Sequence, residues 1–227
     1  MKGNIMKILL VYAHPEPDSF NGALRDITVK TLTELGHEVQ VSDLYAMQFD
    51  PVSSRRNFET VKNPDFLKLQ FEEMHATEHA GFAPDIATEI AKLKWADLMI
   101  WQFPLWWFSV PAILKGWVDR VFAMGSVYGY GHMYEDGMLR GKRALLSVTT
   151  GAGADAYKPD GSNGDINGVL RPIQRGMLEF VGFDVLKPQI YYSASKVGQE
   201  QRRAWVQEWV ARLASIEQEE PVGAGRY

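Results

Sequence analysis

The sequence predicts an α/β fold: an open, doubly wound sheet of five parallel strands in the order 2-1-3-4-5, with helices on both faces. Two observations lead to this prediction. Short, almost continuously apolar segments alternate along the 227 residues with longer segments of helical periodicity. Continuous apolar runs are typical of parallel strands that are covered on both faces.

The first part of the chain contains two predicted strands with one helix between them. The first strand is expected at Lys7–Tyr12, which is almost entirely apolar. Ser19 is the predicted N-cap of the following helix, and Gly36, which tolerates the left-handed conformation, is expected to end it. A second strand is predicted at 39–41.

The segment 44–81 is irregular, apart from an amphipathic stretch at 66–75 whose register the pattern does not determine. Pro84 then begins a helix, since proline is favoured in the first helical turn. The remaining predicted elements are helices at 84–95, 111–121, 169–180 and 199–216, and strands at 97–103, 143–149 and 185–191.

Composition limits the possible functions. With 46% hydrophobic residues and no flexible linker, the chain is expected to form one domain over residues 1–227, with loose extensions at 1–5 and 217–227. The net charge of −4, with scattered basic residues, argues against nucleic acid or an anionic membrane as partner. The absence of cysteine excludes disulfides and thiolate chemistry. We expect no metal site, no membrane insertion and a cytoplasmic location, because the first apolar segment is too short for a signal peptide or a membrane span.

Three consecutive aromatic residues, Trp106, Trp107 and Phe108, follow the strand at 97–103. Pro104 and Pro111 restrict the backbone on either side, so we expect an ordered loop that could hold a flat ring. The alternative is that the aromatic residues cover a core or form a subunit contact.

A second unusual loop follows the first strand. It has neither the glycines of a dinucleotide-binding motif nor a phosphate-binding P-loop. His14, the Ser19 hydroxyl and the free N–H groups of Phe20 and Asn21 at a helix N-terminus could instead bind a phosphate. Taken alone, Ser19 is an ordinary helix cap and His14 an ordinary turn residue.

A third loop, Thr149-Thr150-Gly151-Ala152, follows the fourth strand, and Tyr157 lies shortly after it. Hydroxyls, small residues and a neutral phenol can donate hydrogen bonds to carbonyl oxygens or to charge on a ring. An ordinary surface tyrosine is the alternative for Tyr157. Strands one, three and four are neighbours in the predicted order, so the three loops should meet in one crevice at the switch point.

Four segments, 13–21, 42–47, 102–117 and 149–151, resemble the NAD(P)H:quinone oxidoreductases of the DT-diaphorase type, and the likeness runs from about residue 6 to residue 216. This resemblance implies a flavodoxin-like homodimer that carries FAD, with FMN less favoured, and has its active sites at the dimer interface. It also implies transfer of a hydride from NADH or NADPH to the flavin and then to a quinone in the same pocket, by a ping-pong mechanism.

Carried over residue by residue, the resemblance assigns the FAD phosphates and ribityl chain to His14, Ser19, Phe20 and Asn21, with Gln70 as a further contact. The flavin ring is assigned to Pro104, Leu105, Trp106, Trp107 and Phe108 on one side and to Thr149, Thr150, Gly151 and Ala152 on the other. Asp119 and Arg202 match positions near the adenine. Tyr128 and Tyr130 match tyrosines that reach over the partner subunit's flavin and enclose the nicotinamide or the quinone.

One departure from the family concerns its catalytic tyrosine and histidine. Tyr157 matches the tyrosine, but Asn163 stands in place of the histidine. An asparagine amide forms hydrogen bonds but does not titrate. We therefore hypothesise that Tyr157, alone or with the loop amides, stabilises charge on the reduced ring.

A second departure is that the chain stops without the C-terminal extension of the longer animal enzymes, which suggests a more open pocket. A nitro- or azoreductase with the same flavin chemistry is therefore an alternative function. A regulatory flavoprotein subunit of a potassium-efflux system is another, since such subunits look similar and bind the same cofactors.

Overall fold

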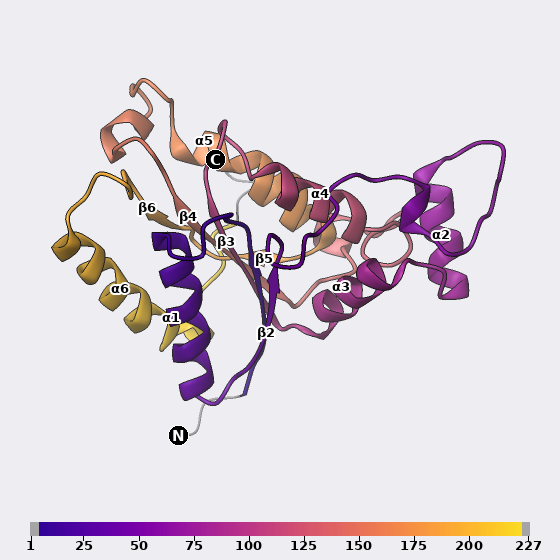
Figure 1. The fold of residues 1–227 in the computed structure, drawn as a ribbon, viewed down its shortest axis with the longest axis horizontal. Helices are drawn as coiled ribbons and strands as arrows, with labels where there is room; N and C mark the ends of the chain where they lie inside the picture. Colours follow the sequence, from indigo (N-terminus) through magenta and orange to yellow (C-terminus); the bar gives the residue numbers. More distant parts are fainter. Residues whose placement is uncertain (1–4, 224–227) are drawn as a thin grey trace.

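The computed structural model of the chain describes residues 5–223. Their centre is a parallel sheet in the order β2-β1-β3-β4-β5, with a further strand, β6, also paired with β4 (Figure 1). The predicted strand order is thus confirmed. The strands are β1 (Lys7–Tyr12), β2 (Glu38–Asp43), β3 (Leu98–Pro104), β4 (Arg143–Thr149), β5 (Asp184–Val185) and β6 (Gln189–Tyr191).

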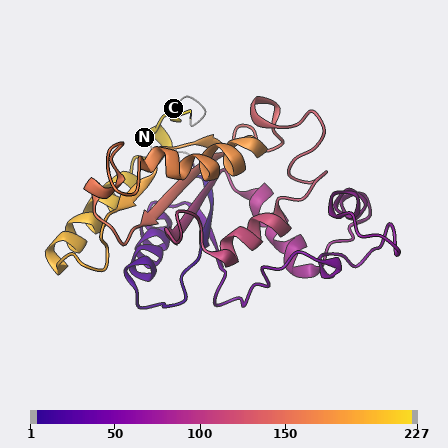
Figure 2. The ribbon, with the colours of Figure 1, turned by 90° about the horizontal axis from the view of Figure 1, so that it is seen from above.

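Helices cover both faces of the sheet (Figures 1 and 2). Since successive side chains of a strand point to opposite faces, Ile8 and Leu10 of β1 belong to one core and Leu9 and Val11 to the other. The first core is closed by α1 (Phe20–Glu34) and α6 (Gln199–Leu213), and the second by α3 (Pro84–Trp95), α4 (Ala112–Val121) and α5 (Ile166–Ile173).

The start of α1 confirms the predicted cap. Ser19 Oγ accepts a hydrogen bond from the N–H of Gly22 at 3.1 Å, and Gly36 follows the helix with φ of 90°. Gly22 packs tightly, because a Cβ at this position would lie 1.8 Å from the carbonyl oxygen of Pro17. The backbone before α1 therefore turns back over the first helical turn.

Predictions near the end of the sheet need correction. The strand expected at 185–191 is two short strands, because Pro188 has no N–H to donate and the pairing with β4 is interrupted before Gln189. The strand expected at 97–103 includes Pro104, which pairs with Thr149, so Pro104 ends the strand rather than beginning the loop.

The regular helix expected at 169–180 is also wrong in its limits and geometry. α5 begins earlier, where Asp165 caps the N–H of Asn167. Pro172 lies inside α5, and the chain then continues as a π-helical turn and a 3₁₀ turn up to Gly182, whose φ is 105°. The last predicted helix ends at Leu213 rather than at residue 216.

A loose tail from residue 217 is not supported for residues 217–223. The N–H of Val222 donates to the carbonyl of Val185 at 2.9 Å, and Arg212 pairs with Glu219 at 2.7 Å. Residues 1–4 and 224–227 lie outside the described part of the chain, so the expectation for them stays a prediction. Between residues 5 and 223, no helix has the length and hydrophobicity needed to cross a bilayer.

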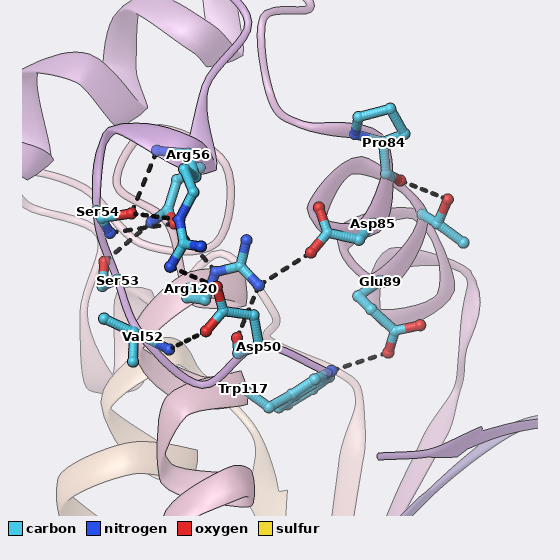
Figure 3. Close-up of polar contacts among 12 residues, drawn as sticks. Asp50, Val52, Ser53, Ser54, Arg56, Pro84, Asp85, Glu89, Trp117 and Arg120 are labelled. Carbon is cyan, nitrogen blue, oxygen red and sulfur yellow. Dashed lines mark hydrogen bonds and ion pairs between the residues drawn. The ribbon is translucent and has the colours of Figure 1, made fainter. Parts of the chain in front are cut away.

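The irregular segment after β2 is held by a buried arginine (Figure 3). Arg120 of α4 is only 3% exposed and donates to Asn57 Oδ1 at 3.0 Å, to the carbonyl of Asp50 at 2.8 Å and to Asp85 at 2.9 Å. These contacts attach the 50–57 segment to α3 and α4. Further along, α2 (Leu69–His79) replaces the uncertain helix expected at 66–75 and lies apart from α1 and α6 (Figure 1).

Candidate functional site

The three loops singled out in the sequence meet in one cavity of about 340 Å³ at the carboxyl ends of β1, β3 and β4. This volume lies within the range of ordinary ligand pockets. The cavity is lined by His14, Ser19, Phe20, Asn21, Pro104, Leu105, Trp106, Thr149, Thr150, Gly151, Ala194, Ser195 and Arg202. Eleven of these were expected from the sequence, and Ala194 and Ser195 were not.

A buried polar network links the three loops beneath the cavity. Gln102 of β3 donates from Nε2 to Asn21 Oδ1 at 2.8 Å, and Asn21 Nδ2 donates to Thr149 Oγ1 at 2.9 Å. All three side chains are at most 5% exposed. Buried amides that are paired in this way hold their backbones in place, so the start of α1 is aligned with the ends of β3 and β4. Sequence reasoning missed Gln102, although a polar residue in an apolar strand was the available signal.

One end of the cavity offers donors suited to an anion. In α1, the N–H groups of Phe20 and Asn21 have no acceptor within the helix. His14 Nδ1 lies 3.0 Å from both the N–H and the carbonyl of Glu16, so Nε2 is the ring nitrogen left for a ligand. Arg202 reaches the same cavity from α6 and is oriented by a hydrogen bond from Nε to the carbonyl of Ala194.

The aromatic loop is a tight turn rather than a broad ledge. Trp106 and Ser109 exchange two backbone hydrogen bonds of 3.0 Å, and Trp107 and Phe108 between them have φ of 51° and 59°. This is the geometry of a type I′ turn, in which glycine and asparagine are usual. Bulky residues there store backbone strain, which is characteristic of functional sites.

Only the first ring of this turn lies in the cavity. Trp106 lines it, with its ring centroid 6.2 Å from that of His14. Trp107 is 95% exposed and Phe108 51% exposed, and neither lines the cavity. The predicted aromatic wall is therefore supplied by Trp106 within this chain, while Trp107 and Phe108 project outward.

The third loop is held by backbone contacts with the end of β6 and the segment that follows it. The N–H of Thr150 donates to the carbonyl of Tyr191, and that of Ser193 to the carbonyl of Ala152, both at 3.0 Å. A Cβ built on Gly151 would meet no atom of the described chain within 4 Å. The loop thus presents Gly151 openly, so a ligand can approach its backbone closely.

Tyr157 and Asn163 lie behind this loop and do not line the cavity. Tyr157 is 8% exposed, and its ring centroid is 5.9 Å from that of Tyr192. The N–H of Asn163 donates to the carbonyl of Ala156. Ala152, between the cavity and Tyr157, is partly buried and does not line the cavity either.

Four other predicted site residues lie outside the cavity. Gln70 is on α2, and its Nε2 is 3.4 Å from the hydroxyl of Tyr128. Asp119 of α4 pairs with Lys115 at 2.6 Å, and Tyr130 is 73% exposed. α2, which carries Gln70, lies on the opposite side of the molecule from α1 and α6 (Figure 1).

A second cavity of about 460 Å³ adjoins the first between α1 and α6. The two share Ser19, Phe20 and Arg202, and the second also includes Ala23 and Val206. No sequence motif predicted it, because it depends on how two helices distant in the chain pack together. A third cavity of about 610 Å³ contains the Arg175–Glu179 ion pair and shares no residue with either.

Comparison with known proteins places the chain among flavodoxin-like proteins. Residues 6–214 match the protein family described as having a flavodoxin-like fold. Ribosyldihydronicotinamide dehydrogenase (quinone) of Homo sapiens is 46% identical over 217 residues, which cover 95% of this chain and 94% of that protein. NAD(P)H dehydrogenase (quinone) 1 of Cavia porcellus is 43% identical over 219 residues, covering 96% and 80%.

A solved structure agrees with these relatives. A Klebsiella pneumoniae protein assigned as a quinone reductase superposes with a TM-score of 0.91 at 43% identity, covering 96% of this chain and 87% of that one. The superposition therefore covers nearly the whole of this chain.

Proposed function

Because this chain belongs to the flavodoxin-like family and, within it, to the NAD(P)H:quinone oxidoreductases, we propose that it is a flavin-dependent enzyme. It would carry electrons from NAD(P)H to a quinone. The observation that carries the proposal is the first cavity. It combines an anion-binding helix N-terminus, an aromatic wall and an open glycine loop at the switch point of the sheet.

The residues present suit a flavin. The N–H groups of Phe20 and Asn21, with His14 and Arg202, would hold its phosphate groups. Pro104 to Trp106 would bound one side of the ring and Thr149 to Gly151 the other. When bound, a flavin accepts a hydride and passes two electrons to an acceptor.

The chain's part in the reaction is binding, orientation and charge stabilisation. Reacting atoms must be held about 3 to 3.5 Å apart in an aligned geometry, which rigid aromatic surfaces supply. We assign Tyr157 and the amides of the 150–152 loop to stabilising charge on the reduced ring. Asn163 cannot hold a titratable proton there. Flavin reduction that is as fast in Tyr157→Phe as in the wild type would remove Tyr157 from this role.

FAD is the cofactor that we propose, rather than FMN. The second cavity continues the first past Phe20 and Arg202, and it offers apolar contact from Ala23 and Val206. An adenosine attached to the flavin phosphate would extend into this space, and FMN would leave it unused.

We further propose a homodimer in the cytoplasm. Tyr128, Tyr130 and Asp119 do not line the cavity of their own chain, and Trp107 and Phe108 are exposed beside it. Pairing of two copies would bring the tyrosines of one over the flavin of the other, as the family resemblance implies. Sedimentation equilibrium tests this, since a flavin-loaded protein that is fully active as a monomer would contradict it. The cytoplasmic assignment rests on the absence of cysteine.

The deciding experiment uses the purified protein. It should be yellow, should be bleached by NADH or NADPH under anaerobic conditions, and should regain its colour with a benzoquinone. Parallel double-reciprocal lines are expected, because donor and acceptor alternate in one pocket. Rates with quinones, nitroaromatics and azo dyes then identify the acceptor class. A folded protein that stays colourless with both FAD and FMN would overturn the proposal.

A further inference from the structure

Two consecutive glutamates of α2, Glu72 and Glu73, are buried and hold different loops. Glu72 is 2% exposed and accepts hydrogen bonds from the N–H groups of Lys62 and Asn63, at 2.7 and 2.9 Å. Glu73 is 6% exposed, and its Oε2 accepts a hydrogen bond from the N–H of Met124 at 2.7 Å. Buried carboxyl groups are costly unless they are hydrogen bonded, so each bond holds its loop against the helix.

The loop that Glu73 holds is the turn at 123–128, and α2 contacts it at further points. Thr77 Oγ1 lies 3.5 Å from the carbonyl oxygen of Met124. Met124 is also the residue whose N–H donates to Glu73. A Cβ built on Gly125, whose φ is 86°, would be 3.4 Å from the Cα of Met74. The turn and the helix are thus in close backbone contact.

This turn determines where Tyr128 lies. The N–H of Gly125 donates to the carbonyl of Tyr128 at 2.7 Å, and the N–H of Val127 donates to that of Ala123 at 2.9 Å. Movement of the turn relative to α2 would therefore move Tyr128 with it. Tyr130 follows two residues later and is exposed.

α2 also affects the chemistry of Tyr128. Burial raises the pKa of Tyr128, while the hydrogen bond from Gln70 opposes the shift. Because Gln70 Nε2 donates to the phenol oxygen at 3.4 Å, the phenol keeps its own proton for another acceptor. The side chain is prepared as a neutral hydrogen-bond donor.

We propose that Glu73 is a positioning residue for the acceptor site: it touches no substrate, but it holds the 123–128 turn so that Tyr128 and Tyr130 are placed to bind the quinone. This inference rests on the proposed function. Glu72 provides the matched contrast, since it is the neighbouring buried carboxyl group and holds a loop that contains no assigned site residue.

Hydrogen–deuterium exchange tests the positioning directly and requires no turnover. In the flavin-free and the flavin-loaded protein, Glu73→Leu should speed exchange in residues 124–131 by about tenfold, the effect of losing one buried hydrogen bond. Glu73→Gln keeps an oxygen acceptor and should exchange like the wild type. Glu72→Leu should change exchange only near Lys62 and Asn63. Unchanged exchange in Glu73→Leu would overturn the inference.

Steady-state kinetics test the consequence for the acceptor. With matched flavin content, Glu73→Leu should raise KM for a benzoquinone about fivefold and leave kcat within about twofold, because uniform binding is lost. Glu73→Gln and Glu72→Leu should keep the wild-type KM. An unchanged KM in Glu73→Leu, or an equal loss in Glu73→Gln, would contradict the proposal.

Two further results distinguish a failure of the inference about Glu73 from a failure of the proposed function. If Glu73→Leu does not fold, Gln70→Leu replaces it as the test variant. It removes the contact to the Tyr128 hydroxyl and should raise the quinone KM about twofold. An unchanged quinone KM in Gln70→Leu would count against a role of α2. If the wild type does not oxidise NAD(P)H with any quinone, the proposed function fails. The exchange experiment then still decides whether Glu73 positions the turn.

Discussion

The cavity at the strand ends and the α2 side of the molecule place their side chains in different ways. His14, Pro104 and Thr149 end or follow neighbouring parallel strands, so the sheet itself brings them together. Tyr128 lies in a turn outside the sheet, which a few polar contacts from α2 hold. The first arrangement follows from topology, whereas the second depends on single hydrogen bonds. Changes in the two regions should therefore have different consequences.

The largest effect is expected where backbone approaches backbone beside the cavity. In Gly22→Ala the new methyl group would lie 1.8 Å from the carbonyl oxygen of Pro17, so the start of α1 must shift. We expect a loss of about 3 kcal/mol in the free energy of unfolding and greatly weakened FAD binding. Urea denaturation and FAD titration measure the two effects.

The control for this change is Gly36→Ala at the other end of α1. There a Cβ meets no described atom within 4 Å, and only the φ of 90° opposes it. A cost of about 1 kcal/mol with unchanged FAD affinity is expected. Equal FAD affinities for both variants would show that the start of α1 does not build the flavin site.

Where the 50–57 segment packs on α3 and α4, outside the cavity, Arg120→Met should reduce stability without altering the cavity. The change removes the hydrogen bonds that Arg120 donates to Asn57, Asp50 and Asp85 (Figure 3), and losing these contacts should cost about 2 kcal/mol. FAD affinity should stay within about twofold, because the strand ends are unaffected.

The matched control is Arg56→Met, also in Figure 3. Its ion pair with Asp50 is solvent-exposed, with 71% of the Arg56 side chain accessible, so less than about 0.5 kcal/mol should be lost. Thermal unfolding compares the two variants. A strong loss of FAD affinity in Arg120→Met would show that the two regions are coupled.

A change in the second cavity should separate FAD from FMN. Ala23→Trp would fill the space between α1 and α6 while leaving the first cavity intact. FAD should bind about tenfold more weakly, a change of 1.4 kcal/mol, and FMN should bind as before. Ala211→Trp on the exposed side of α6 is the control. Equal weakening of both cofactors would place the adenosine elsewhere.

Relief of backbone strain should produce a smaller change of opposite sign. Phe108→Gly replaces a residue with φ of 59° by one that adopts this conformation freely. We expect a gain of about 1 kcal/mol in unfolding free energy, together with weaker flavin or quinone binding, because an aromatic surface is lost. Guanidinium denaturation measures the first effect. A destabilised variant would show that Phe108 packs against a partner in the assembled protein.

The smallest effect concerns pH. Burial by itself raises the pKa of Glu72, but hydrogen bonds from Lys62 and Asn63 bring it below its usual value. Its contribution to stability should therefore be present near neutral pH and be lost as the pH falls through that lowered pKa. Burial raises the pKa of Glu73, so stability from Glu73 should instead be lost as the pH rises through its raised pKa. Unfolding midpoints of Glu72→Gln and Glu73→Gln between about pH 3 and pH 8 should change slope in opposite directions.

The success of prediction from the sequence follows the same division between the two regions. β1, β4 and α3 have the predicted limits, because an apolar run or a helix-initiating proline is a local signal. The register of α2 was undetermined, since its face is set by two buried glutamates rather than by apolar periodicity. Pro188 and the polar Gln102 were local signals within apolar strands, but that Asn21 would join Gln102 to Thr149 depends on how distant segments pack.

The sequence by itself determined the alternation of strands and helices, the strand order and the convergence of three loops, because these depend on local periodicity and on the handedness of connections. The tertiary structure alone decided which aromatic ring faces the cavity, that a second cavity adjoins it and that Glu73 holds the turn of Tyr128. These features arise from contacts between residues far apart in the chain. Their geometry depends on packing, which local composition does not encode.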